Sequence, residues 1–260
     1  MMWLVAIVFS IFLLPVLAAD IYVEDYKVHI EGVIRDGDAE RVASLVSGMR
    51  IVSSFNVNTL GGNVDEALKI ASLIEGTSAR FVIKKGGICA SSCFFMFISS
   101  QDRSAIPFYG EEGQNPSAEN RAKGYYYVGI HRPYLASKDE VTAASADKQE
   151  ALMQVIRDYL RKKQVPQYLV DEMMGRSSNQ IYWLREKDLD LLGDYSPGLE
   201  EVLIKKCGYN KTVKYSISMT NTQLNELYDC ISEVRQREYL PSQTKYIKRL
   251  ATGWRPWGKR

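Results

Sequence analysis

The sequence carries little net charge. Its 33 Lys and Arg residues nearly balance its 31 Asp and Glu residues, so the formal net charge is only +2. Basic and aromatic residues are interleaved only at the very end of the chain, from Trp254 to Arg260. Because proteins that bind nucleic acid need a stronger or more concentrated positive charge, the sequence argues against a nucleic-acid partner.

The chain also lacks the paired cysteines of a structural zinc site. Its 4 cysteines do not form two close Cys-x-x-Cys pairs, so we expect no metal and no cofactor. We instead predict two disulfides, Cys89–Cys93 and Cys207–Cys230. In a regular helix the spacing of Cys89 and Cys93 is near the upper limit for a disulfide, so this bond requires a non-helical turn, which Gly86-Gly87 could provide.

Positive charge is missing from the start of the chain as well. No Lys or Arg precedes the apolar run from Trp3 to Leu17, which only Ser10 interrupts. Small residues before Asp20 nevertheless offer a cleavage site. Residues 1–19 are therefore predicted to be a secretory signal peptide, or else an uncleaved N-terminal anchor. Either one places the body of the protein outside the cytoplasm, in the periplasm or secreted, where disulfides persist.

Residues 20–198 have the pattern of an α/β domain. Short apolar segments typical of strands alternate with segments whose apolar residues recur at helical spacing, which favours a parallel sheet with right-handed crossovers. Residues 101–124 are polar and are expected to form a surface excursion. Strands are expected at 27–34, 51–59, 79–83 and 125–130. Helices are expected at 39–48, 64–74, 139–164 and 166–174, and a further helix begins at Ser91. Gly76 is expected to stop the helix at 64–74.

Residues 199–260 differ in character from the α/β domain. They contain Cys207, Cys230 and an amphipathic helix that is expected from about residue 223 to 238. A disulfide-stapled helical extension is the simplest account. Its terminal side chains Trp254, Arg255 and Trp257 could contact a protein or an anionic membrane surface, or could form a solvated end.

Three short motifs follow three of the predicted strands. Gly61-Gly62 follows one strand, Ser91 follows the next, and His131 ends a later one. Because the carboxyl ends of parallel strands share one edge of a sheet, these residues can share one crevice. A Ser/His hydrolase needs this arrangement, in which the imidazole takes the serine proton and backbone N–H groups bind the oxyanion. The alternative is that Ser91 or Ser92 only caps the buried helix that follows.

Together the three motifs resemble the Clp protease proteolytic subunit and crotonase superfamily, in particular its secreted bacterial members. The stretch from Asn58 to Val64 looks like the glycine loop of this family, Cys89 to Cys93 like its nucleophile turn, and Gly129 to Pro133 like the segment with its catalytic histidine. The resemblance covers residues 28–195. It implies a crotonase/Clp-protease-like parallel β-sheet with repeated ββα-type units and flanking helices.

The resemblance also implies the role of each site residue. Ser91 would be the nucleophile and His131 the general base, while the Gly61-Gly62 loop and the Ser92 N–H would bind the oxyanion. The substrate would be a peptide or a protein, and relatives with this fold commonly form homo-oligomers. We therefore expect a secreted serine hydrolase that acts as a peptidase.

The sequence departs from the family at the third catalytic residue. An Asp is expected shortly before Trp183-Leu184, but residues 178–182 contain no carboxylate. Asn179 or Gln180 could orient the imidazole as a neutral amide, or the site could be a Ser/His dyad.

Two further alternatives remain open. A catalytically inactive chain could keep the fold and serve as a periplasmic binding or scaffold protein, since fold does not determine function. A Ser/Lys dyad with Lys84 or Lys85 as the base is the other alternative.

Overall fold

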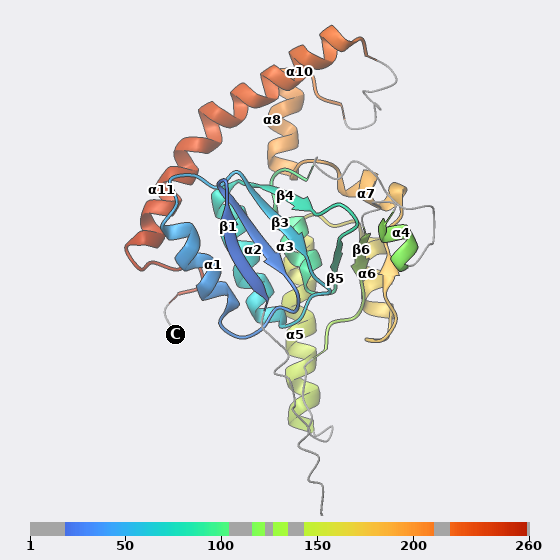
Figure 1. The fold of residues 1–260 in the computed structure, drawn as a ribbon. Helices are drawn as coiled ribbons and strands as arrows, with labels where there is room; N and C mark the ends of the chain where they lie inside the picture. The colour runs from blue at the N-terminus through green and yellow to red at the C-terminus, as the bar shows by residue number, and fades with distance from the viewer. Residues whose placement is uncertain (1–18, 104–115, 123–126, 135–142, 211–218, 259–260) are drawn as a thin grey trace, which may run out of the picture.

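The computed structural model describes residues 19–103, 116–122, 127–134, 143–210 and 219–258 (Figure 1). All but the last residue of the expected signal peptide, and most of the expected surface excursion, lie outside these ranges. No helix in the described ranges is long and apolar enough to cross a membrane.

The larger sheet of the described chain has the strand order β1-β2-β3-β4. The pairs β2–β3 and β3–β4 are parallel, as predicted, whereas β1–β2 is antiparallel. Apolar residues alternate along β2, β3 and β4 and are buried, which gives these strands one apolar face: Val28 and Ile30, Phe55 and Val57, and Phe81 and Ile83. The strands are β1 (Asp20–Glu24), β2 (Lys27–Glu31), β3 (Ser54–Asn58) and β4 (Arg80–Ile83).

The smaller sheet has the order β5-β6-β7, with β5–β6 parallel and β6–β7 antiparallel. Its strands are β5 (Ile88–Ala90), β6 (Tyr127–Ile130) and β7 (Tyr182–Trp183). A parallel bridge between Thr59 and Cys89 connects it to the end of β3. The described residues therefore form two mixed sheets rather than one parallel sheet.

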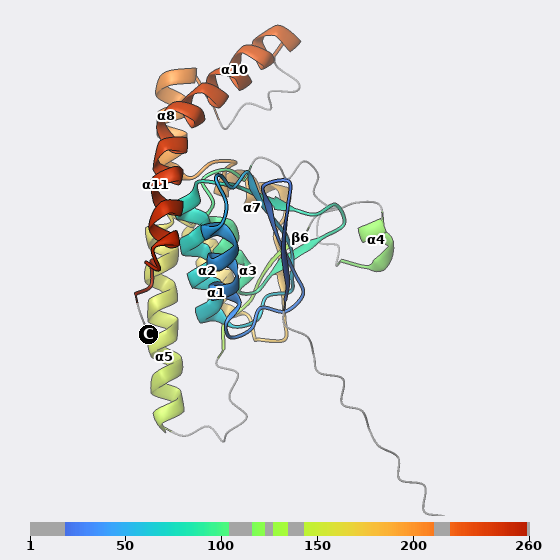
Figure 2. The ribbon, with the colours of Figure 1, turned by 60° about the vertical axis from the view of Figure 1, so that its left-hand side comes forward.

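Three helices follow the strands of the N-terminal half. They are α1 (Asp38–Ser47), α2 (Val64–Thr77) and α3 (Cys93–Ser99). Figure 2 shows α1 and α2 on one side of the larger sheet. All seven residues of α3 are buried, as its continuous apolar run predicts. The order along the chain is β1-β2-α1, β3-α2 and β4-β5-α3, so the first and third of these units have the ββα order and the second does not.

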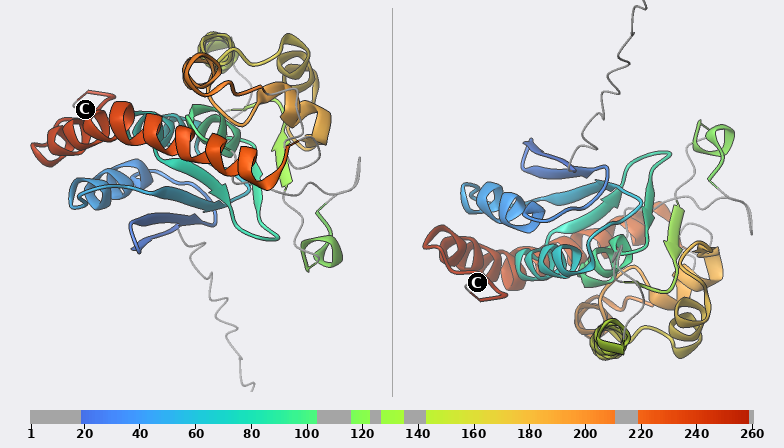
Figure 3. Two further views of the ribbon diagram at one scale, coloured as in Figure 1. Left: turned by 90° about the horizontal axis from the view of Figure 1, so that it is seen from above. Right: turned by 90° about the horizontal axis from the view of Figure 1, so that it is seen from below.

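The rest of the described chain, from α4 onward, is largely helical. Its helices are α4 (Ala118–Ala122), α5 (Ala143–Lys162), α6 (Gln167–Gly175), α7 (Glu186–Leu192), α8 (Pro197–Cys207), α10 (Asn221–Val234), the π-helix η1 (Arg235–Tyr239) and α11 (Leu240–Ala251). Helices α8 and α10 extend away from the sheets, and α11 returns to the body of the molecule (Figures 1 and 2). In the view from above in Figure 3, the segment from α10 to α11 lies in front of the sheets. Ile247 and Leu250 of α11 are buried in the main core.

The C-terminal tail also folds back onto the domain. Trp254 and Trp257 pack against the main core, and Arg255 Nε donates to Glu40 Oε2 at 2.8 Å. These three tail side chains were candidates for contact with a protein or a membrane surface. In the structure they contact the chain itself.

Two local features differ from the sequence-based expectations. Strand β1 was not expected, because its hairpin turn uses Asp25 and Tyr26, both with positive φ, in place of the usual Asn-Gly signal. Helix α2 continues past Gly76 and ends at Thr77, since Ser78 adopts the left-handed capping conformation. Gly76 instead makes room for α11, because a Cβ there would lie 2.1 Å from the Tyr246 ring.

Candidate active site

Ser91 lies at the turn between β5 and α3. Its φ of 57° is left-handed, which is uncommon for a residue other than Gly. The Ser91 N–H donates to the Gly129 carbonyl at 2.9 Å, and the Ser91 carbonyl accepts from the Phe94 N–H at 3.0 Å. The turn is therefore fastened to β6 on one side and to α3 on the other.

Ser92 occupies the N-cap position of α3, but its side chain makes no capping hydrogen bond. The Ser92 hydroxyl is buried and has no hydrogen-bond partner among the described residues. Helix capping therefore does not account for either serine. The Ser91 carbonyl points into the helix, and a trans peptide directs the following Ser92 N–H away from it.

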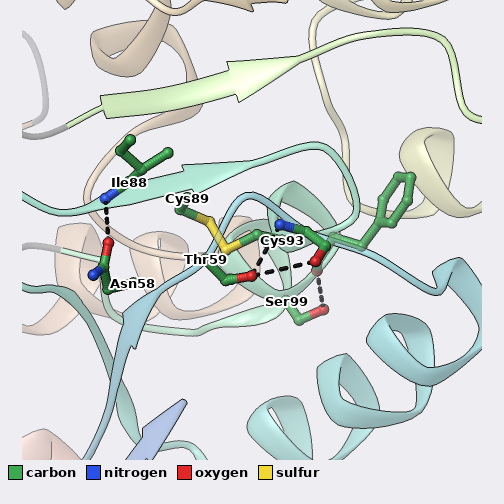
Figure 4. Close-up of a disulfide and its surroundings, with 8 residues drawn as sticks. Asn58, Thr59, Ile88, Cys89, Cys93 and Ser99 are labelled. Carbon is green, nitrogen blue, oxygen red and sulfur yellow. Dashed lines mark hydrogen bonds between the residues drawn. A yellow bond between two sulfur atoms is a disulfide. The ribbon is translucent and has the colours of Figure 1, made fainter. Parts of the chain in front are cut away.

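A disulfide joins Cys89 of β5 to Cys93 of α3 (Figure 4). Ser91 and Ser92 lie in the four-residue separation that this bond closes. Both cysteines are fully buried. A second disulfide joins Cys207 to Cys230, so both predicted pairings are confirmed. The non-helical segment that the first bond needs is the end of β5 with Ser91, not the earlier Gly pair. Two disulfides indicate an oxidising compartment.

The glycine loop begins beside β5. The Thr59 N–H donates to the Ile88 carbonyl at 2.7 Å, and the Thr59 carbonyl accepts from the Ala90 N–H at 3.1 Å. The Asn58 side chain accepts from the Ile88 N–H at 3.0 Å, as Figure 4 shows. These bonds hold the start of the loop against the strand that leads to Ser91.

Gly61 and Gly62 allow a close approach that no other residue could make. A Cβ on Gly61 would lie 2.8 Å from Ser91 Cβ and 2.9 Å from Ser92 N, and a Cβ on Gly62 would lie 2.1 Å from the Ile34 carbonyl oxygen. The Gly61 carbonyl accepts from the Ile34 N–H at 2.9 Å. Because the peptide bond is trans, the Gly62 N–H points away from Ile34.

His131 follows directly after β6 and is only 7% exposed. Its Nδ1 lies 2.9 Å from the Arg132 carbonyl oxygen. When Nδ1 carries the proton, it donates to this carbonyl, and Nε2 is left as the acceptor. A main-chain carbonyl therefore stands where an Asp, Asn or Gln side chain was expected.

Ser91, His131, Gly61 and Gly62 all line one cavity of about 630 Å³. No hydrogen bond joins Ser91 to His131 in the described part of the chain. Catalytic hydrogen bonds are often long or misaligned before substrate binds and tighten in the complex with substrate. The remaining lining residues are Val33, Ile34, Arg35, Asp36, Leu60, Asn63, Val64, Asp65, Pro133, Tyr134 and Leu152.

The structure does not bring Asn179 and Gln180 to this cavity. Both are exposed, neither lines the cavity, and Asn179 Oδ1 accepts from the Ser177 hydroxyl at 2.6 Å.

Asp188 is the nearest buried carboxylate in the following sequence, and it is used elsewhere. It accepts from the Tyr168 and Tyr182 hydroxyls and from the Arg185 N–H. Burial alone would raise the Asp188 pKa, but these hydrogen bonds hold it below its usual range.

The Lys84 side chain also lies away from the cavity. It forms an ion pair with Glu31, whose hydrogen bond raises the Lys84 pKa, so the amine stays protonated and is a poor base. Lys85 is exposed and does not line the cavity either. The geometry therefore contradicts the Ser/Lys alternative.

Sequence analysis missed several residues of the cavity wall. Leu60, Tyr134 and Leu152 supply apolar surface, and Arg35 adds a guanidinium whose buried Nε has no partner in the described chain. Leu60 lies within the glycine-loop motif, but no motif marks Tyr134, Leu152 or Arg35. Arg35 directly follows Ile34, which pairs with Gly62 of the glycine loop. This position beside the loop is the one signal that could have identified Arg35 as a residue of the site.

The backbone is similar to several solved structures. ClpP1 from Listeria monocytogenes matches at 15% identity and a TM-score of 0.44, covering 65% of this chain and 88% of that chain. A mutant of that protein matches at 18% identity and a TM-score of 0.40, with the same 65% and 88% coverage. A mutant of 1510-N, a membrane-bound stomatin-specific protease, matches at 14% identity and a TM-score of 0.40, covering 70% and 83%.

Two of these matches are structures of ClpP1, which is a Clp protease like those that the three motifs resemble. No protein-family profile matches the sequence. No curated protein is significantly similar to it.

Proposed function

We propose that the protein is a serine hydrolase, specifically a peptidase that acts on a peptide or protein substrate through Ser91 and His131. One observation carries the proposal. The left-handed Ser91, the buried His131 and the Gly61-Gly62 loop come from three separate segments and line the same cavity. No cofactor is required for this chemistry.

The Arg132 carbonyl supports His131 as the general base. A proton on Nδ1 that is donated to this carbonyl fixes the ring and leaves the Nε2 lone pair available to the serine hydroxyl. The proposed site is therefore a Ser/His dyad with a main-chain orienting group. Neither Asn179 nor Gln180 is needed in it.

Two backbone N–H groups support the oxyanion role. The Gly62 N–H points away from Ile34, and the Ser92 N–H points away from α3. The close packing of Gly61 on the Ser91–Ser92 peptide brings these two segments together beside the cavity. Preorganised donors of this kind are often the largest single contribution to acyl-transfer catalysis.

In the proposed reaction Ser91 Oγ attacks the scissile carbonyl carbon while its proton passes to His131 Nε2. The negative charge that develops on the carbonyl oxygen is bound by the two N–H groups. His131 then gives the proton to the leaving amine as the C–N bond breaks, which leaves an acyl-enzyme. Water activated by the same imidazole completes the hydrolysis and restores the Ser91 hydroxyl.

The test is covalent labelling with a fluorophosphonate probe, read by mass spectrometry of the modified peptide. We expect the wild type to be labelled on Ser91, and Ser91→Ala and His131→Ala to lose labelling. The matched control is Ser232→Ala, which removes an exposed hydroxyl from α10. Labelling that persists in Ser91→Ala, or that the wild type never shows while folded, would overturn the proposal.

One observation favours a second candidate, an inactive fold that serves as a binding or scaffold protein. No side-chain carboxylate or amide meets His131, and no hydrogen bond joins it to Ser91 in the described residues. A partner that is still captured by Ser91→Ala and His131→Ala variants, together with an unlabelled wild type, would support this candidate.

The proposed setting is periplasmic or extracellular, and residues 1–19 are proposed to be removed as a signal peptide. Mass spectrometry of the exported protein would give the processing site, and an intact N-terminus would favour an uncleaved anchor. Self-association is proposed by resemblance only. A single monomeric species in light scattering at working concentration would count against it.

A further inference from the structure

The Cys89–Cys93 disulfide encloses the proposed nucleophile. We propose that this bond is a positioning device, which keeps Ser91 in the left-handed conformation that presents its hydroxyl to the cavity. The proposal rests on the proposed function of Ser91. The two cysteines would not contact the substrate, and they would affect the reaction only by positioning Ser91.

Ser91 has a backbone conformation that its residue type disfavours. Left-handed φ values are readily adopted by Gly, whereas a Cβ meets the neighbouring carbonyl oxygen. A serine at φ 57° therefore needs surroundings that hold it there. Gly at this position would remove the strain, but a nucleophilic hydroxyl would be lost with it.

The disulfide spans the strained residue directly. Cys89 belongs to β5 and Cys93 is the first residue of α3, so the bond ties the end of the strand to the start of the helix (Figure 4). Their Cα atoms lie 5.2 Å apart, with Ser91 at the midpoint of the enclosed sequence. A relaxed, extended Ser91 would separate these two ends, which the bond prevents.

The same bond reaches the oxyanion loop. Cys89 pairs with Thr59 in a parallel bridge, and Gly61 packs on the peptide between Ser91 and Ser92. The turn that the disulfide closes is therefore in direct contact with the loop that carries the Gly62 N–H.

The second disulfide provides a contrast within the chain. Cys207 and Cys230 are separated by 23 positions, and Cys89 and Cys93 by only 4. In the chain-entropy account a cross-link stabilises the fold more when it closes a longer loop. Stability is therefore the expected role of Cys207–Cys230, whereas the short Cys89–Cys93 loop contributes chiefly to local geometry.

The test compares two double variants, Cys89→Ala with Cys93→Ala, and Cys207→Ala with Cys230→Ala. Saturation kinetics of fluorophosphonate labelling separate probe binding from the bond-forming rate constant. We expect the first variant to show an unchanged binding constant and a rate constant lowered by roughly tenfold, in line with the strain of one left-handed residue. The pH profile of labelling should keep its midpoint, because His131 is untouched.

The Cys207/Cys230 variant should lose thermal stability and keep the labelling rate constant of the wild type. Because removing a buried disulfide leaves empty space, a second variant, Cys89→Ala with Cys93→Val, restores volume without restoring the bond. It should show the same loss of rate as the double Ala variant.

Each outcome bears on a different claim. If the wild type is labelled on Ser91, and both Cys89/Cys93 variants fold and are labelled at an unchanged rate, the positioning role is refuted. The proposed function is then left intact. A wild type that is never labelled would refute the proposed function itself. If every form without the Cys89–Cys93 bond were unfolded, the bond would be a requirement of the fold, and the positioning proposal would also be overturned.

Discussion

The backbone N–H of Ser91 donates to the carbonyl of Gly129, which lies two residues before His131, at 2.9 Å. This bond continues the parallel pairing of β5 with β6, in which Ala90 lies opposite Gly129. The candidate nucleophile and the candidate base are thus placed by paired strands rather than by independent loops. Rigid elements of this kind hold reacting groups more precisely than loops do.

Replacing Gly61 should disable the site. In Gly61→Ala the new Cβ would lie 2.6 Å from the Ala90 carbonyl oxygen and 2.8 Å from Ser91 Cβ, at a φ of 94°. We expect labelling of Ser91 to fall at least tenfold and the free energy of unfolding to drop by about 2–4 kcal/mol, because the steric clash adds to the backbone strain. Labelling kinetics and urea unfolding measure the two effects.

Gly37→Ala is the matched control for this substitution. Gly37 has a similar φ of 89°, but a Cβ there meets nothing within 4 Å. This variant should lose only about 1 kcal/mol of stability, which is the cost of the positive φ, and should label at the wild-type rate. Equal labelling losses in both variants would show that packing against the serine turn is unimportant.

The orienting role of the Arg132 carbonyl predicts that the amide side chains are dispensable. Asn179→Ala combined with Gln180→Ala should keep the labelling rate of Ser91 within about twofold of wild type, because both side chains are exposed and lie away from the cavity. His131→Ala in the same assay should remove labelling. A tenfold loss of labelling rate in the double variant would instead support a triad in which Asn179 or Gln180 orients His131.

Much of the site could be predicted from order along the chain. Gly61, Ser91 and His131 each follow an apolar strand, and parallel strands bring such positions to one edge. The cysteine pairings also followed from sequence, since Cys89 and Cys93 share one turn. Local patterns of this kind suffice where neighbours in sequence are also neighbours in space.

Other features depended on contacts between distant segments. The Arg132 carbonyl at His131 is a main-chain group, and main-chain acceptors have no signature in a sequence. The inward fold of the tail involves α1, where Glu40 accepts a hydrogen bond from Arg255 across about two hundred residues of sequence, a pairing that is visible only in three dimensions. The β1 hairpin was missed because Asp25-Tyr26 adopts a turn that usually requires Gly.

Asp188 should contribute to stability in a pH-dependent way. Its pKa is held below the usual range because hydrogen bonds from Tyr168, Tyr182 and the Arg185 N–H outweigh burial. A carboxyl with a lowered pKa stabilises the folded state above its unfolded pKa and loses that contribution as pH falls through the folded value. Asp188→Asn should therefore cost about 1–3 kcal/mol at pH 7, and the difference from wild type should narrow below about pH 4.

Asp190→Asn is the control for this effect, because Asp190 lies on the same helix and is exposed. Its unfolding curves should follow those of the wild type at every pH. Urea unfolding between pH 3 and pH 8 measures both variants. A constant stability difference for Asp188→Asn across this range would contradict the role assigned to the ionised carboxylate.

Arg103 should be required as an arginine and not merely as a cation. It is 5% exposed and donates to the carbonyl oxygens of Leu192 at 2.8 Å, Gly193 at 3.1 Å and Tyr195 at 2.7 Å. Burial lowers the Arg103 pKa to about 10, so the guanidinium remains charged at neutral pH. Its planar fork donates to three carbonyls at the end of α7 and in the segment that leads to α8, and so fastens this connection.

Arg103→Lys keeps the charge but replaces the fork with a single ammonium group, which cannot reach all three carbonyls. We expect it to lower the free energy of unfolding by about 2–4 kcal/mol, measured by urea denaturation at pH 7. Arg157→Lys, on the partly exposed α5 pair with Glu150, should change stability by less than about 0.5 kcal/mol. Equal and small effects in the two variants would mean that charge alone matters at Arg103, and that the connection from α7 to α8 is held by other contacts.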